Sequence, residues 1–104
     1  MDLNDEQIER VNYWIKTIFY YVEYPEPVQE YWWKDREENE IFMEDMGLDH
    51  LKASARRVQI DIDEFPKLIS QNSPDFHIYK KTLLVPAKKK QMELEEIFRK
   101  NANI

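Results

Sequence analysis

Hydrophobic residues near the start of the chain recur at intervals of three and four positions, which is the spacing of one helix face. Asn4 and Gln7 have the spacing of a capping box, so we expect a first helix to begin at Asn4. Pro25 and Pro27 should end it, because a proline disfavours helical backbone in the residue before it. The expected buried face consists of Ile8, Val11, Ile15, Ile18, Phe19 and Val22.

The same period predicts a second helix from about Pro27 to Gly47, since proline suits a first turn and glycine suits a helix end. Asp35 and Asn39 interrupt its apolar stripe, so they need polar partners if they are buried, or they mark a bend. The expected stripe consists of Val28, Tyr31, Trp32, Phe42, Met43 and Met46.

A third helix is expected from Asp49, its N-cap, to Pro66, which ends or kinks it. Its apolar face consists of Leu51, Ala55, Val58, Ile62 and Phe65. Residues 58–62 also alternate with a period of two, so a strand is an alternative there. We favour the helix because its stripe is longer than the alternation.

The end of the chain is less regular. Residues 70–75, SQNSPD, have the composition of a turn, and residues 76–86, FHIYKKTLLVP, have strand-like character. A last helix is expected over residues 86–100. Its lysines precede its glutamates, which opposes the helix dipole, so this helix needs tertiary contacts to be stable.

These elements predict one domain, residues 1–104, that is mainly α. We expect a small bundle of about four helices with an extended or short β segment before the C-terminal helix. A single glycine favours this class, because tight hairpins often need glycine.

Composition excludes several chemistries. With 1 glycine and 0 cysteines, the chain can form neither a dinucleotide fingerprint, nor a P-loop, nor a thiolate zinc site. His50 and His77 lack any metal-binding motif around them. We therefore expect no catalysis, no cofactor and no metal. The polar start and short apolar runs also predict a soluble, cytoplasmic protein without a membrane segment.

Charge divides the chain into unequal halves. Residues 1–50 hold 14 Asp or Glu and 4 Lys or Arg, whereas residues 51–104 hold 7 and 11. Such a split is typical of a protein with a charged partner. The alternative is that the two halves neutralise each other within the fold.

Aromatic residues are concentrated in the acidic half, where residues 19–35 hold seven of the chain's fourteen rings. On the expected second helix, Trp33 faces away from the core and acids follow it at heptad spacing. The candidate partner-binding residues are Trp33, Glu37, Glu40 and Glu44, with the outer tyrosines Tyr13, Tyr20 and Tyr24. Carboxylates and rings together suit a partner that carries arginines. Alternatively, these rings pack beneath the C-terminal segment and leave a plain solvated acidic face.

We therefore expect a non-catalytic, acidic, protein-binding module that recognises a basic surface of another protein. It could act as an inhibitor and DNA mimic that occupies a nucleic-acid-binding site. Two alternatives remain. A nucleic-acid-binding accessory protein would use the basic C-terminal half, and a homo-oligomeric structural protein, such as a homodimer, would use the outer tyrosines as its seam. The candidate nucleic-acid residues are Lys80, Lys81, Lys88, Lys89 and Lys90.

Overall fold

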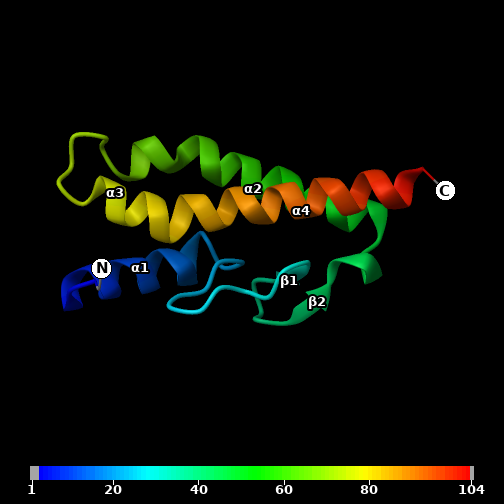
Figure 1. The fold of residues 1–104 in the computed structure, drawn as a ribbon, viewed down its shortest axis with the longest axis horizontal. Helices are drawn as coiled ribbons and strands as arrows, with labels where there is room; N and C mark the ends of the chain where they lie inside the picture. Colours follow the sequence, from blue (N-terminus) through cyan, green and yellow to red (C-terminus); the bar gives the residue numbers. More distant parts are fainter. Residues whose placement is uncertain (1–2, 104) are drawn as a thin grey trace.

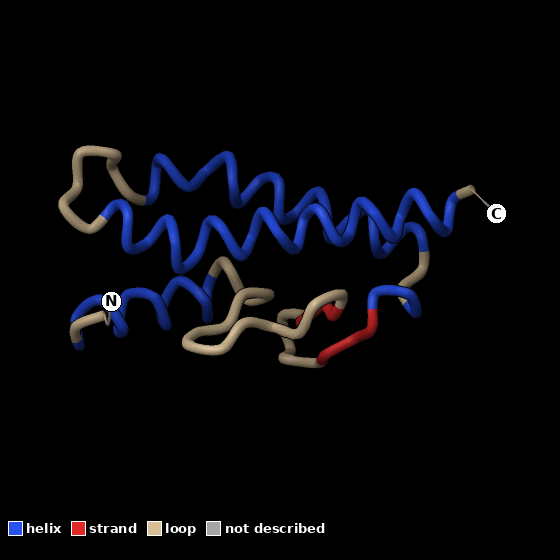
Figure 2. The backbone as a smooth tube through the Cα atoms, in the orientation of Figure 1, coloured by secondary structure: helices blue, strands red, loops and turns tan. Residues whose placement is uncertain are grey.

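The computed structural model describes residues 3–103 and consists of two layers (Figure 1). One layer is a pair of long antiparallel helices, α2 (Leu48–Leu68) and α4 (Val85–Ala102). The other layer runs beside them and contains α1 (Asp5–Thr17), an irregular segment and a small hairpin. The tube in Figure 2 shows that strand occurs only in this hairpin among the described residues. The prediction of a mainly helical protein with a short β segment is confirmed in this coarse form.

The capping box at the start of α1 is present as predicted. The Gln7 amide N–H donates to Asn4 Oδ1 at 2.8 Å, and the Asn4 amide N–H donates to Gln7 Oε1 at 2.9 Å. The expected extension of this helix to Pro25 is wrong, because α1 ends at Thr17. Beyond it, Phe19, Tyr21 and Val22 are all buried, and no helix face contains these three positions together.

The expected second helix over residues 27–47 is also wrong. Strands β1 (Trp32–Lys34) and β2 (Glu40–Phe42) form an antiparallel hairpin there, followed by the short 3₁₀ turn η1 (Met43–Asp45). The polar residues that interrupt the helical pattern make the turn. The Asn39 amide donates to Asp35 Oδ1 at 2.8 Å, and the Asp35 amide donates to the Asn39 carbonyl at 2.9 Å. Asp35 and Asn39 therefore end the strands rather than bend a helix.

Helix α2 is confirmed, and the alternative of a strand over residues 58–62 is wrong. The helix continues past Pro66 by two residues, to Leu68. Gly47, which we expected to stop a helix, is instead the N-cap of this one, and the expected N-cap, Asp49, lies in the first turn. Its backbone is extended, so the position needs no special glycine conformation.

Residues 76–86 are helical, so the expected extended or β segment before the last helix is wrong. Helix α3 (Phe76–Tyr79) leads through a π-helical turn, η2 (Lys80–Leu84), directly into α4. Tyr79, Leu83 and Ala87 are buried at four-residue spacing, which explains the helix. The wide turn lies just before Pro86, whose ring would otherwise clash with the carbonyl four residues back.

Because 76–102 is one continuous helical rod, the described residues hold three long helices, and the expected bundle of about four is not confirmed. The rod is where the first layer docks. The rings of Trp14 on α1 and Tyr79 meet edge to face at 5.0 Å, and Gln7 donates a hydrogen bond of 3.1 Å to Asp75.

The core lies between the layers and is rich in aromatic rings. Tyr21 and Trp33 stack at 5.0 Å with an angle of 16° between their planes. Phe19 contacts Phe65 of α2 edge to face at 6.4 Å. Much of the ring-rich segment therefore fills the interior between the irregular segment and α2.

Candidate functional site

Trp33 does not face solvent. It is 2% exposed and lies in the core on Tyr21, with the half-buried Tyr20 meeting its edge at 6.1 Å. The expectation that Trp33 points away from the core is wrong, because side chains alternate along a strand and the inner position in β1 is Trp33. The helical column of Trp33, Glu37, Glu40 and Glu44 therefore does not exist as a column.

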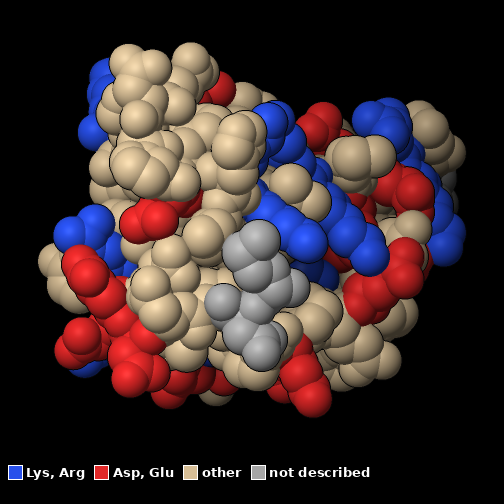
Figure 3. All heavy atoms as spheres, turned by 60° about the vertical axis from the view of Figure 1, so that its left-hand side comes forward, with Lys and Arg blue, Asp and Glu red and all other residues tan. Residues whose placement is uncertain are grey.

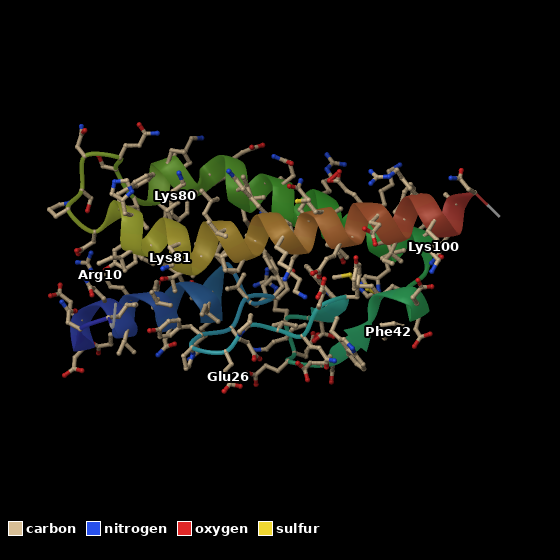
Figure 4. The ribbon with its side chains drawn as sticks, in the orientation of Figure 1. Arg10, Glu26, Phe42, Lys80, Lys81 and Lys100 are labelled. Carbon is tan, nitrogen blue, oxygen red and sulfur yellow. The ribbon has the colours of Figure 1, made fainter. Side chains whose placement is uncertain are left out.

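The outer face of the hairpin carries a different aromatic pair. Trp32 and Phe42 are cross-strand partners, and their ring centroids lie 5.5 Å apart. Trp32 is half-buried, and Phe42 is 36% exposed; Figure 4 shows Phe42 at the hairpin side of the molecule. Both residues belong to the apolar stripe predicted to be buried, so that prediction is wrong for them. Alternation on both sides of the Asp35–Asn39 turn was the signal that could have placed them on the outside.

Two predicted acids lie on this hairpin. Glu37 is exposed in the turn, and Glu40 is exposed opposite Lys34. Glu40 shares the outer face of β2 with Phe42, since the two are two positions apart. Lys34 is directed to other acids, with its Nζ 3.0 Å from Glu23 and 3.9 Å from Glu38.

Glu44 lies apart from these two acids. It is half-buried in η1, and its Oε1 accepts a 2.7 Å hydrogen bond from Lys100 of α4. This contact raises the pKa of the Lys100 ammonium. Glu44 is thereby partly neutralised, and it connects the end of the hairpin to the last helix.

The three outer tyrosines are spread along the first layer and do not form one surface. Tyr13 is 63% exposed on α1. Tyr20 is half-buried beneath the Arg36 guanidinium, which lies 4.7 Å from the ring centroid, and burial raises the pKa of its phenol. Tyr24 is half-buried and lines a groove of about 420 Å³ opposite His77 and Lys81.

Negative charge is concentrated in the first layer. Residues 3–47 hold 12 Asp or Glu and 4 Lys or Arg. In the space-filling view of Figure 3, acidic side chains gather along the lower edge and basic ones lie across the centre. Most of the acids in this layer are exposed, so contacts within the fold leave a net negative surface.

The lysine group of the C-terminal half is smaller than expected. Lys80, Lys81, Lys88 and Lys89 are exposed, and Figure 4 labels the first two on the rod. Lys90 is 5% exposed and points inward, where its Nζ donates to the Gln29 carbonyl at 2.8 Å. Burial lowers the pKa of the Lys90 ammonium.

The helix N-terminus that we expected beside these lysines is also not found there. The backbone is helical without a break from residue 76 to residue 102, so residue 86 lies inside a helix. Its neighbouring amides are therefore turned into the helix rather than toward an anion.

Two negative findings concern residues 3–103. Among them, no group of three or more His, Asp or Glu side chains is arranged to hold a metal ion. No helix formed by them has the length and apolar character needed to cross a membrane.

In comparisons with family models, curated proteins and solved structures, no match to the chain is found. The function is therefore inferred from the geometry of the site alone.

Proposed function

We propose that the protein is a non-catalytic binding module whose acidic first layer recognises a basic surface of another protein. One observation carries this proposal. The outer face of the hairpin presents the Trp32–Phe42 ring pair together with Glu40, and the exposed Glu37 lies in the adjoining turn. We call this set of four residues the hairpin face.

The chemistry of the hairpin face suits arginine. A carboxylate accepts both arms of a guanidinium fork, and an aromatic ring binds the same cation over its face. Tryptophan is also enriched among the residues that dominate interface energetics, where truncation costs about 2 kcal/mol or more. The excess of acids across the first layer would add long-range attraction and a faster association rate.

In its finer form, the proposal is that the protein acts as an inhibitor. Its negative layer would imitate the charge of DNA and occupy a surface with which the partner binds nucleic acid. This form is supported by the overall charge of −6 and by the concentration of acids in one layer. We also propose that the protein is cytoplasmic.

Binding is favoured over catalysis by the way the buried acids are used. Asp61 accepts hydrogen bonds from Tyr21 and Arg57, and Glu93 accepts them from Tyr31 and Lys90. Both acids hold the two layers or adjacent turns together. For Asp61, these contacts satisfy both carboxylate oxygens and account for its burial without a substrate.

The test is quantitative affinity capture from native lysate with matched variants. Trp32→Ala and the double variant Glu37→Lys/Glu40→Lys alter the hairpin face. Asp63→Lys/Glu64→Lys makes the same charge change on the exposed side of α2 and serves as the control. Circular dichroism confirms that each variant is folded.

We expect the hairpin variants to lose a partner that wild type and the α2 control both retain. The captured protein should bind through a cluster of arginines or lysines. Substitutions that neutralise this cluster should abolish the binding. Equal loss in the α2 control would reduce the effect to net charge and contradict the proposal. Two other results would overturn the proposal. Recovery of nucleic acid that depends on Lys80, Lys81, Lys88 and Lys89 would favour the nucleic-acid-binding alternative. Recovery of a second copy of this chain would favour the homo-oligomer.

A further inference from the structure

The carboxylate of Glu93 is unusual among the described residues. It is 5% exposed on α4, and its Oε1 accepts hydrogen bonds from the Tyr31 amide at 3.1 Å and from Lys90 Nζ at 3.0 Å. The other oxygen, Oε2, is buried and has no hydrogen-bond partner within residues 3–103. A buried carboxylate oxygen strongly favours a donor, so this atom points to a group that is missing from the isolated chain.

A cavity of about 420 Å³ adjoins Glu93, and we call it the Glu93 cavity. One wall is Glu30 and Tyr31, just before β1, and the other is a single face of α4 with Met92 and Glu96. Four glutamates and two cations line it in all. The cations, Lys89 and Arg99, lie about 15 Å apart along the helix, so they lie at the two ends of the cavity.

Tyr31 forms the strained part of this wall. Its φ is 65°, a left-handed conformation that a bulky side chain rarely adopts. Interaction of its hydroxyl with the Glu96 carboxylate raises the pKa of the phenol, and Glu30 and Glu93 act in the same direction. All three carboxylates line the cavity together with Tyr31. Strain of this kind is concentrated at ligand-binding sites, where a bound group can relieve it.

We propose that the Glu93 cavity binds the guanidinium group of an arginine side chain from the protein partner. This inference rests on the proposed function and names the anchor that the partner inserts. A guanidinium carries five N–H donors in a plane, which suits Glu93 Oε2 together with Glu30 and Glu96. Its aliphatic stem would lie on Met92, which is 71% exposed, and on the ring of Tyr31.

The position of the cavity fits this role. Tyr31 immediately precedes Trp32, so the cavity begins where the hairpin face ends. A divalent metal ion is a poorer occupant, because no cluster of acids within the described residues has metal-binding geometry. Since Glu93 Oε2 is closed to solvent, a guanidinium reaches it only with a small movement of the strained Tyr31 segment.

The experiment is a backbone NMR titration of the whole chain with N-acetylarginine amide. N-acetylcitrulline amide, which has nearly the same shape without the charge, is the ligand control. We expect saturable binding in the millimolar range, with the largest shifts at Tyr31, Glu93 and Glu96. The Glu96→Gln and Glu30→Gln variants should each bind about tenfold more weakly, since each removes one charged hydrogen-bond acceptor.

Glu9→Gln on the exposed side of α1 is the matched control and should bind as wild type does. Glu93→Gln tests the central carboxylate, and the exposed variants keep the test decisive if that buried change unfolds the protein. Absence of saturable shifts, or equal shifts with the citrulline compound, would overturn the proposal and leave the cavity holding only water.

The outcome is distinguishable from failure of the proposed function. Partner capture that depends on Trp32, Glu37 and Glu40 but is unchanged in Glu96→Gln would refute the arginine anchor and keep the hairpin face. Saturable binding of the arginine compound without a partner that depends on the hairpin face would support the cavity and refute the wider function.

Discussion

The hydroxyl of Tyr21 donates a 2.8 Å hydrogen bond to Oδ2 of Asp61, 40 positions further along the chain, and so joins the irregular segment to α2. Arg57 donates to the other oxygen, Oδ1, at 3.0 Å. Tyr21 is fully buried, and its ring stacks on Trp33. The contact fixes the segment that leads from α1 to the hairpin, and with it the orientation of the hairpin face.

Removal of this hydrogen bond should destabilise the protein. Tyr21→Phe keeps the ring on Trp33 but leaves Asp61 Oδ2 buried without its donor, so we expect the free energy of unfolding to fall by about 1–3 kcal/mol. Urea denaturation followed by circular dichroism measures the change. Tyr13→Phe, at an exposed tyrosine, should change stability by less than about 0.5 kcal/mol. Equal stability of the two variants would show that the Tyr21 contact contributes nothing.

Asp61 also predicts a particular pH dependence. Burial raises the pKa of its carboxyl above the ordinary value of 3.8, against the lowering effects of Tyr21 and Arg57. The folded protein therefore keeps this proton to higher pH than the unfolded chain does. The resulting stabilisation is complete below pH 3.8 and is lost as the pH rises through the folded-state pKa.

Asp61→Asn removes this titration. The difference in unfolding free energy, wild type minus variant, should therefore fall as the pH rises from below 3.8 through the folded-state pKa. The carboxyl carbon of Asp61, followed by NMR, gives the pKa directly. A pKa at or below 3.8, with a free-energy difference that rises with pH, would mean that the two hydrogen-bond donors outweigh burial.

The buried Lys90–Glu93 pair should be asymmetric in its response to mutation. Lys90→Met leaves an uncompensated carboxylate in the interior, so we expect a loss of about 3–5 kcal/mol in unfolding free energy. The double variant Lys90→Met/Glu93→Gln removes that charge and keeps an oxygen to accept the Tyr31 amide. It should recover most of the loss in urea denaturation.

Lys89→Met is the matched control, because Lys89 is the adjacent residue and its ammonium is exposed. The stability of this variant should be close to that of wild type. A double variant as unstable as Lys90→Met alone would mean that loss of the Lys90 contacts, rather than the stranded charge, is responsible.

The hairpin turn offers a stabilising change. Glu38 has φ 68°, a left-handed conformation in which glycine is free of the steric penalty of a side chain. Its carboxylate is largely exposed and lies 3.9 Å from Lys34 Nζ, which is a weak ion pair, so removing this side chain costs little stability. We expect Glu38→Gly to raise the free energy of unfolding by about 1 kcal/mol. Glu37→Gly, whose backbone needs no such relief, should instead be neutral or destabilising.

The long helices could be predicted because their signals are local. The Asn4–Gln7 capping box begins α1, and a five-residue apolar stripe defines α2. The last helix was also predicted. Because its own charges oppose the helix dipole, we expected it to need contact with another element. In the structure, Leu94 and Ile97 are buried where α4 packs along α2.

The hairpin was missed because its evidence is divided between two short strands. Each strand has three residues, and Trp32 and Phe42 fit a helical stripe about as well as an alternating one. The choice is made by tertiary contacts, since Trp33 has Tyr21 as a stacking partner. Residues 76–84 were missed for a related reason, because β-branched and aromatic residues there become helical against α1 and α2.

For the candidate site, the sequence predicted the acids but not the rings beside them. Glu37 and Glu40 are exposed as expected, whereas Trp33 is replaced on the outer face by its neighbour Trp32. A one-residue change of face is the consequence of reading a strand as a helix. The orphaned oxygen of Glu93 could not have been predicted, because it depends on contacts with residues about 60 positions away.

The most direct test of the central claim is a map of where a basic ligand binds. Backbone NMR shifts should be recorded while an arginine-rich peptide is added to the whole chain at low ionic strength. The account predicts saturable shifts concentrated over residues 30–45 and the facing side of α4, abolished by Glu37→Lys/Glu40→Lys and weakened by salt. Shifts spread over every acidic residue, or confined to α1 and α2, would contradict it.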